Sequence, residues 1–198
     1  QVYAGLTETE RRSIAEDVAG IQQRIGRLSV ARGFGFAVSY DEANTNGLGS
    51  WIDVVEAEVR RSEERIHRVG QIDSRFVERA RRFLAGHETF LRTVGPTPFL
   101  DDTTTKNVIV HEGSLSGIVD TDQVCFGDPF FTVGLTRMAL LSLDAETDYV
   151  DYWLDAVEAT TAQRSIVQAY TLVFCFNFMS ELGQTFNKEV SFSDERAA

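Results

Sequence analysis

Two carboxylates and one amide lie close together in the middle of the chain, within residues 99–129. Asp102 is followed five residues later by Asn107, and Asp120 follows after two short β-branched runs. Carboxylate and amide oxygens are the hard donors that Mg²⁺ prefers, and Mg²⁺ is the cation that phosphoryl transfer uses. The segment could therefore place two acids and an amide around one divalent cation, provided that a tight turn brings its halves together.

The two β-branched runs predict a β-hairpin. They cover residues 107–110 and 115–119, and the four residues between them include Gly113, which suits the turn. Two strands alone are not stable in water, so the flanking helices must cover one face of the hairpin.

Amphipathic patterns on both sides predict the helices that position this hairpin. Thr7 with Glu10 forms a capping box that opens a helix reaching Leu28, and Ser50 with Asp53 can cap a second one. Further helices are expected over residues 74–94, 130–143, 149–159 and 162–183. The last is apolar nearly all round, which is typical of a helix that is central to the core or packed on another chain. Residues 31–50 are rich in glycine and asparagine and are expected to form a loop.

Inward-facing side chains are expected on two of these helices. The second helix should bury Trp51, Val54, Val55, Val59 and Ile66. The apolar residues of the third are Phe76, Val77, Ala80, Phe83, Leu84, Phe90 and Leu91, with its arginines outward.

The sequence has no internal repeat, low-complexity block or linker, so its helix and hairpin patterns predict one helical domain over residues 1–198, mainly α with a small β-hairpin (α+β). The hydrophobic content of 43% supports a sizeable core, and the net charge of −11 argues against nucleic-acid binding, since phosphate neutralisation needs clustered cations. The longest apolar run, residues 170–179, is about half the length of a membrane helix, so no membrane association is expected. Cys125 and Cys175 lie in apolar runs, which indicates buried, reduced thiols in a cytoplasmic protein.

Four pieces of the central segment occur in an order that resembles a known family. They are Asp102, Asn107, Ile118-Val119-Asp120 and Gly127-Asp128-Pro129. The aminoglycoside phosphotransferase family, small-molecule kinases related to protein kinases, has the pattern His-x-Asp-x-x-x-x-Asn, a hairpin, Ile-Asp-x and Gly-Asp-Pro. The resemblance covers essentially the whole chain and implies the C-terminal lobe of a protein-kinase-like fold.

The resemblance implies a chemical role for each polar residue of the segment. Asp102 would be the base or orienting carboxylate for the substrate hydroxyl, and Asn107 and Asp120 would be magnesium ligands. The implied activity is ATP- and Mg²⁺-dependent transfer of a phosphoryl group to a small-molecule hydroxyl. An aminoglycoside, another amino alcohol, a sugar or a macrolide all remain open as acceptors.

Three further residues receive supporting roles by the same analogy. Ile109 and Val119 lie beside the proposed ligands and would touch the adenine of the nucleotide. Asp128 would be structural and would satisfy backbone donors of the catalytic loop.

The sequence also departs from the family pattern. Leu100 occupies the family's histidine position, which removes a hydrogen bond that would tie the catalytic loop to the core, and Thr132 replaces a frequent aspartate. The two lysines, Lys106 and Lys188, do not lie in a strand ahead of Asp102, where such enzymes carry a phosphate-binding lysine. The chain is therefore expected to begin past the hinge, to lack the N-terminal β-lobe and to be inactive alone.

Two other hypotheses follow from these departures. The chain could be a non-catalytic helical interaction or scaffold module that kept the kinase-like fold. It could also pair with a separate N-terminal lobe or with itself, since an orphaned lobe exposes an apolar cleft wall.

Overall fold

The computed structural model describes residues 5–28, 33–37, 48–182, 185–186 and 189–190. Its helices are α1 (Glu8–Ile25), α2 (Trp51–Val69), α3 (Ser74–Ala85), α4 (Glu88–Thr93), α5 (Phe130–Ser142), α6 (Asp148–Ala156) and α7 (Thr161–Met179). Its strands are β1 (Gly35–Ala37), β2 (Thr97–Leu100), β3 (Val108–His111), β4 (Ser114–Ile118), β5 (Val124–Gly127), β6 (Thr185–Phe186) and β7 (Glu189–Val190). The predicted class, mainly α with a small hairpin, is confirmed.

Helix starts coincide with the capping residues that the sequence indicates. The Thr7 side chain accepts a hydrogen bond from the Glu10 N–H, and the Glu10 carboxylate accepts one from the Thr7 N–H at 2.7 Å. The Ser50 hydroxyl accepts from the Asp53 N–H at the start of α2. Each cap satisfies backbone donors that the first turn of a helix leaves free, so these starts can be read locally.

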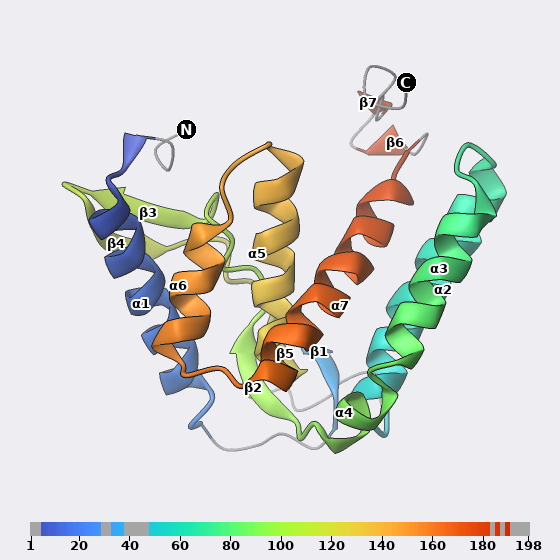
Figure 1. The fold of residues 1–198 in the computed structure, drawn as a ribbon, viewed down its shortest axis with the longest axis horizontal. Coiled ribbons are helices and arrows are strands. Elements are labelled where there is room, and N and C mark those ends of the chain that lie inside the picture. Colours follow the sequence, from blue (N-terminus) through green and yellow to red (C-terminus); the bar gives the residue numbers. More distant parts are fainter. Residues whose placement is uncertain (1–4, 29–32, 38–47, 183–184, 187–188, 191–198) are drawn as a thin grey trace.

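Helix α7 lies at the centre of the fold, which settles one of the alternatives left open for it. In Figure 1 it stands between α5 and the α2–α3 pair, and it packs against all three. Tyr170 and Ile166 of α7 are fully buried in a core cluster with Trp51, Phe99 and Phe131. Helices α1 and α6 pack together on the other side of α5 and close a second cluster. Among the described helices, none combines the length and the apolar character needed to cross a membrane.

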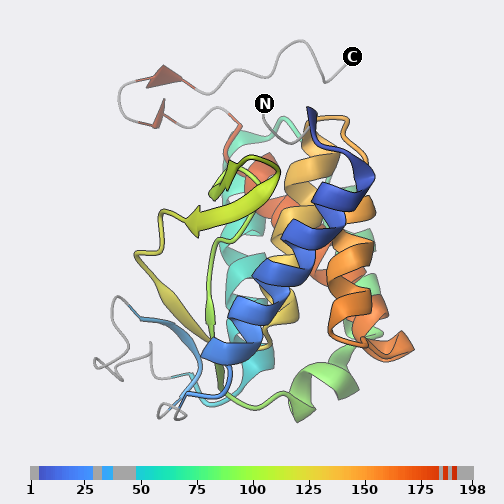
Figure 2. The ribbon, with the colours of Figure 1, turned by 90° about the vertical axis from the view of Figure 1, so that its left-hand side faces the viewer.

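The hairpin formed by β3 and β4 is present, with Val108 opposite Ile118 and the turn at Glu112 and Gly113. Glu112 and Gly113 both have positive φ values, 47° and 72°, and Gly113 provides the flexibility that the sequence indicated. Val108 and Ile118 pack against the cluster that α1 and α6 close, so helices cover one face as expected. Figure 2 shows the hairpin beside α1.

A second sheet, with the strand order β1-β5-β2, was not expected. Residues 31–50 were predicted to be a loop, of which residues 31–32 and 38–47 lie outside the described part of the chain; within the rest, Gly35–Ala37 pair with β5, with Gly35 opposite Phe126. Gly35 has a φ of 109°, a conformation in which glycine is unstrained. A three-residue strand has no periodicity to detect, and it forms here because β5 offers backbone partners on that side.

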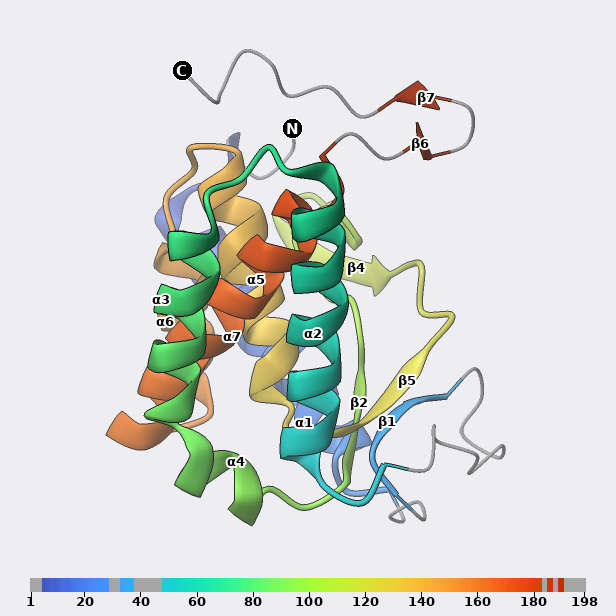
Figure 3. The ribbon, with the colours of Figure 1, turned by 90° about the vertical axis from the view of Figure 1, so that its right-hand side faces the viewer.

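The helix predicted over residues 74–94 is in fact two helices. Helix α3 ends at Ala85, Gly86 caps it, and α4 begins at Glu88. Figure 3 shows α2 and α3 upright with α7 seen between them, and α4 at the lower end of α3. The break is stabilised by His87, whose ring nitrogens lie 3.0 Å from the Phe83 carbonyl and 3.0 Å from the Ser165 hydroxyl.

The expected burial is correct for α2 and partly wrong for α3. All the named residues of α2 are buried, but Phe76 is 54% exposed and Phe83 is 41% exposed. Helix α3 packs on its neighbours through Val77, Ala80 and Leu84, and the two phenylalanines lie on an adjoining face. Likewise Cys125 is buried, whereas Cys175 is only partly buried and lies near these phenylalanines.

Candidate functional site

Asp102 lies just after β2, in a loop that holds its carboxylate in place. Oδ1 accepts hydrogen bonds from the Thr104 N–H at 3.1 Å and from the Thr104 hydroxyl at 2.7 Å, and Oδ2 lies 3.3 Å from the Lys106 ammonium. The side chain is 24% exposed, so it is oriented by the loop yet open to solvent. A carboxylate that turns back on its own backbone in this way is an Asx-type turn.

Gln22 of α1 anchors the residues that lead into this loop. Its amide donates to the Leu100 carbonyl at 2.9 Å and accepts from the Leu100 N–H at 3.0 Å, and it also contacts the Thr103 hydroxyl at 3.2 Å. The Thr103 hydroxyl lies 3.2 Å from that of Thr132 on α5. The Leu100 side chain cannot make the hydrogen bond of the family's histidine, but the buried Gln22 ties the backbone of Leu100 to the core.

Sequence reasoning missed Gln22, although a signal was present. Gln22 follows Val18 by one turn on the apolar face of α1 and is only 4% exposed. A polar residue on a buried helix face needs a partner, because an unpaired buried amide is costly. Its partner, 78 residues away in the chain, could not be named from the sequence.

Asn107 and Asp120 lie at the open end of the hairpin. Asn107 is 6% exposed and its side-chain amide donates to the Asp102 carbonyl at 3.3 Å. The Val119 N–H donates to the Asn107 carbonyl at 2.9 Å, so Asp120 is the residue directly beyond the last rung of the ladder. The fold thus gathers the backbone of Asp102, Asn107 and Asp120 at one place.

The donor set of Asn107 and Asp120 fits a magnesium ion that also binds substrate phosphates. Asn107 uses its nitrogen for the loop, which leaves the amide oxygen for another ligand, and Asp120 is exposed. Magnesium is commonly held by one or two protein carboxylates, with waters and phosphates completing its shell. In the part of the chain that the structure describes, no group of three or more histidine, cysteine, aspartate or glutamate side chains could hold a metal by itself.

The backbone of Asp120 is left-handed. Its φ is 58°, a conformation that costs most non-glycine residues free energy and that aspartate tolerates better than most. Glu112, Asp144 and Glu158 have the same conformation in turns, so at Asp120 it places a sharp turn directly after the hairpin.

Ile109 and Val119 lie on the side of the hairpin that no described helix covers. They are 44% and 47% exposed, whereas Val108 and Ile118 face the core. The structure thus leaves two apolar side chains open beside Asn107 and Asp120.

Asp128 makes contacts that differ from those the resemblance implies. It is 4% exposed, and its carboxylate accepts from the Phe130 N–H at 3.0 Å and from the Tyr170 hydroxyl at 2.8 Å. The Trp51 indole N–H in turn donates to the Tyr170 oxygen at 2.7 Å. Burial raises the pKa of Asp128 to about 6, against the opposing effect of these two hydrogen bonds. Its described bonds therefore join α5 and α7 and do not reach the loop of Asp102.

A second acid, Asp101, stands next to Asp102 and was not singled out from the sequence. Burial and, to a smaller extent, the neighbouring charges of Asp102 and Glu58 together raise the pKa of Asp101 to about 7. The Glu58 pKa is itself raised, chiefly by burial, although Arg61 opposes this. At neutral pH the site therefore holds a carboxyl group that is partly protonated beside the proposed base.

A cavity of about 440 Å³ opens beside Asp102. Its walls come from α2, the loop of Asp102, α5 and α7. The lining residues are Arg61, Arg65, Asp102, Thr104, Thr105, Lys106, Leu135, Ala139, Ser142, Leu143, Phe174, Asn177, Phe178 and Glu181. Its size is that of a small-molecule site, and its lining combines charged side chains of both signs with apolar ones.

Solved structures with the same arrangement of elements are aminoglycoside phosphotransferases. A thermostable mutant of APH(4)-Ia superposes with a TM-score of 0.65 at 20% identity, over 87% of this chain and 58% of that one. The chain has the fold of their C-terminal lobe. The gentamicin complex of APH(2")-IIa gives a TM-score of 0.60 at 15% identity, over 91% of this chain and 58% of that one.

The chain spans 55–60% of the length of these enzymes. The ADP-bound APH(2'')-Ib, at 15% identity and a TM-score of 0.53, is covered over 55% of its length by 91% of this chain. Neither the family models nor the curated proteins gave a match to the sequence. The likeness at these identities concerns the fold alone.

Proposed function

We propose that this chain is the C-terminal lobe of an ATP- and Mg²⁺-dependent phosphotransferase that acts on a small-molecule hydroxyl. The observation that supports it most is the loop of Asp102, held by Gln22, with Asn107 and Asp120 at the hairpin end and a cavity of about 440 Å³ alongside. Few other chemistries need a carboxylate, an amide and a second carboxylate in this order around a phosphate-binding cation.

Asp102 serves as the base in the proposed reaction. The acceptor hydroxyl lies in the cavity, its oxygen bonds to the γ-phosphorus while the bond to ADP breaks, and Asp102 takes the proton. The contacts from Thr104 and Lys106 hold the carboxylate in place beside the cavity. Mg²⁺, held by Asn107 and Asp120, would neutralise charge on the nucleotide phosphates. Asp128 supports the site at a distance, by joining α5 to α7.

Solved relatives of the fold support nucleotide and acceptor binding. The APH(4)-Ia mutants were solved as ternary complexes with ADP or AMP-PNP and hygromycin B. For this chain, Ile109 and Val119 would receive the adenine, and the acceptor would be an aminoglycoside or another amino alcohol. Glu181 at the cavity provides a carboxylate for its amines.

Replacing Asp102 by asparagine in the protein that carries this lobe together with a nucleotide-binding lobe tests the proposal. We expect ATP-dependent phosphorylation to fall by about 10³-fold, because an amide cannot take the proton. Asp122→Asn, at an exposed position two residues beyond Asp120, is the matched control. Unchanged turnover in Asp102→Asn would refute the assignment.

A non-catalytic scaffold is the second candidate, and it is favoured by one observation. Lys106 already neutralises Asp102, as it would if no substrate had to be activated. Calorimetric titration of the two-lobe protein with Mg-ATP separates the candidates, because clear binding would exclude a pure scaffold.

Two accompanying proposals concern the setting of the protein. The described cysteines are free thiols, which supports a cytoplasmic location, and cell fractionation can test it.

Ile109 and Val119 give the hairpin an exposed apolar surface, where a separate N-terminal lobe or a second copy of the chain could pack. Sedimentation that shows only monomer at high concentration would argue against self-association.

A further inference from the structure

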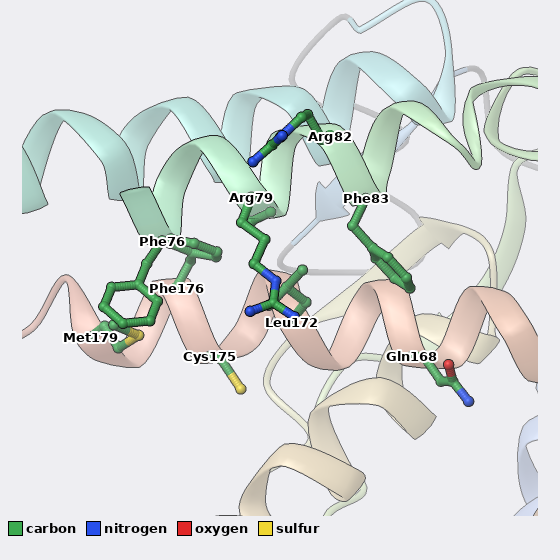
Figure 4. Close-up of a pocket in the computed structure, with 10 residues that line it drawn as sticks. Phe76, Arg79, Arg82, Phe83, Gln168, Leu172, Cys175, Phe176 and Met179 are labelled. Atoms are coloured by element: carbon green, nitrogen blue, oxygen red, sulfur yellow. The ribbon is translucent and has the colours of Figure 1, made fainter. Parts of the chain in front are cut away.

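A groove runs between α3 and α7, away from the loop of Asp102. Its volume is about 760 Å³, and Figure 4 shows the side chains that line it. They are Phe76, Arg79, Ala80, Arg82, Phe83, Gln168, Leu172, Cys175, Phe176 and Met179. We call this surface the α3–α7 groove.

Each wall of the α3–α7 groove is a stripe along a helix. On α3, Phe76 and Phe83 are seven residues apart, which is two helical turns, and both are strongly exposed. On α7, the lining residues are Gln168, Leu172, Cys175, Phe176 and Met179, which follow one another at spacings of four, three, one and three and so share one side of the helix. Two such stripes side by side, about three turns long, have the shape that receives one face of a third helix.

The α3–α7 groove is basic in an acidic protein. The chain has a net charge of −11, yet the groove is lined by Arg79 and Arg82 and by no aspartate or glutamate. The other arginines at the ends and back of α3 are neutralised, Arg75 by Asp73 and Arg81 by Glu63. Among the described residues, no ion pair or hydrogen bond involves the Arg79 or Arg82 side chain. Figure 4 shows Arg79 between the two phenylalanines, extending toward α7.

We propose that the α3–α7 groove binds an amphipathic helix of a partner protein that carries acidic residues beside its apolar face. Apolar residues at i, i+4 and i+7 of that helix would cover Phe76, Phe83 and Leu172, in the helix-in-groove mode of recognition. Aspartates or glutamates flanking them would pair with Arg79 and Arg82, whose positive field would also speed the encounter. This surface is independent of the phosphotransferase site proposed above.

The chemistry of the groove disfavours two other occupants. A two-fold contact between copies of this chain would set the same patch against itself and bring Arg79 and Arg82 near their own copies. A fatty acyl chain needs enclosing walls, but Phe76 is 54% exposed and Phe83 is 41% exposed. A helix is wide enough to cover both rings at once.

Selection from a displayed library tests the proposal. The library holds amphipathic helical peptides of about 18 residues, with fixed apolar positions at i, i+4 and i+7 and the flanking positions randomised. The library is selected for binding to the 198-residue chain. We expect the enriched peptides to carry aspartate or glutamate at the flanking positions, with no enrichment of lysine or arginine there.

Charge reversal on the protein then checks where these peptides bind. We expect Arg79→Glu and Arg82→Glu each to lower the affinity of the protein for the enriched peptides by about tenfold, as measured by fluorescence anisotropy. Peptides that carry lysine at the flanking positions should bind these variants with the lost affinity restored. Arg60→Glu changes the charge by the same amount on an exposed part of α2 outside the groove, and should leave binding unchanged. All three positions are exposed, and circular dichroism confirms that the variants fold.

Three results would overturn the proposal. They are enriched peptides without an acidic bias, equal binding by the Arg82→Glu and Arg60→Glu variants, and a library without binders. In the last case dodecanoate binding, measured by calorimetry, would assign the groove to an anionic amphiphile. A dimer in sedimentation velocity that Phe83→Ser dissolves would assign it to a second copy of the chain.

Discussion

The Gln22 side chain hydrogen-bonds to both backbone polar groups of Leu100, donating to its carbonyl at 2.9 Å and accepting from its N–H at 3.0 Å. The amide of Gln22, from α1, therefore pairs with the end of β2 as a neighbouring strand would. The residue that it holds, Leu100, lies two positions before Asp102. The position of the proposed base therefore depends on a helix that lies 78 residues earlier in the chain.

Replacing Gln22 by alanine should destabilise the protein by about 2–4 kcal/mol, because it leaves a buried N–H, a carbonyl and the Thr103 hydroxyl without their partner. Urea unfolding followed by circular dichroism measures the change. Gln23→Ala is the matched control, since Gln23 is exposed on the same helix and should change stability by less than about 0.5 kcal/mol. Equal effects of the two substitutions would mean that the anchor contributes nothing.

Gly127 of the Gly-Asp-Pro segment is required by the close approach of Trp51. A Cβ atom at this position would lie 2.0 Å from Cε3 of the buried indole, which is far inside van der Waals contact. We expect Gly127→Ala to cost about 3 kcal/mol or more, because Trp51 is fully buried and cannot move aside. Gly117→Ala in β4 is the control, since a Cβ there meets nothing within 4 Å. Thermal unfolding of both variants decides the point, and similar midpoints would contradict it.

Local signals in the sequence account for the starts of α1 and α2. Thr7 and Ser50 begin their helices where they should, because a cap is made with residues two or three positions away. The hairpin is equally local, since its turn and its strands are adjacent in the chain. Strands β1 and β5 escape prediction because a short strand is defined by its partner, and here Gly35 pairs with Phe126.

In the candidate site, too, the residues that are close together in the chain could be predicted and those that depend on distant partners could not. Asp102, Asn107 and Asp120 could be named because they lie within one segment and their types suit one chemistry. The residues that hold them in place could not, since Gln22 and Tyr170 reach their partners across the fold. The pKa of Asp101 also depends on burial and on Glu58 of α2, which the sequence does not place beside it.

Asp101 should make the protein less stable as the pH rises from about 4 to about 7. Its pKa is about 7 in the folded state and 3.8 without the fold, so between these values the folded protein binds the proton more strongly. Stability is then highest below the lower value and falls until the folded carboxyl has ionised. Asp128, with a folded pKa of about 6, acts in the same direction over a narrower range.

Asp101→Asn tests this dependence. We expect the free energy of unfolding at pH 8 to rise by up to about 4 kcal/mol, with little change at pH 4. Denaturant unfolding at both pH values measures the effect, and Asp122→Asn at an exposed position should leave the pH profile as it is. A profile that Asp101→Asn does not flatten would show that this carboxyl is not the source of the dependence.

Replacing Asp120 by glycine should leave the protein at least as stable but remove a ligand for Mg²⁺. Its φ of 58° costs an ordinary residue about 1 kcal/mol, whereas glycine adopts it freely. Asp120→Gly should therefore keep or raise the free energy of unfolding, while Mg²⁺-dependent nucleotide binding by the two-lobe protein is lost. Asp120→Asn is the companion variant, because asparagine tolerates the same conformation and retains one oxygen donor. Unfolding curves and calorimetric titration with Mg-ATP separate the two effects. If Asp120→Gly is as destabilising as a core substitution, the strain is absent, and if it binds Mg-ATP normally, Asp120 is not a ligand.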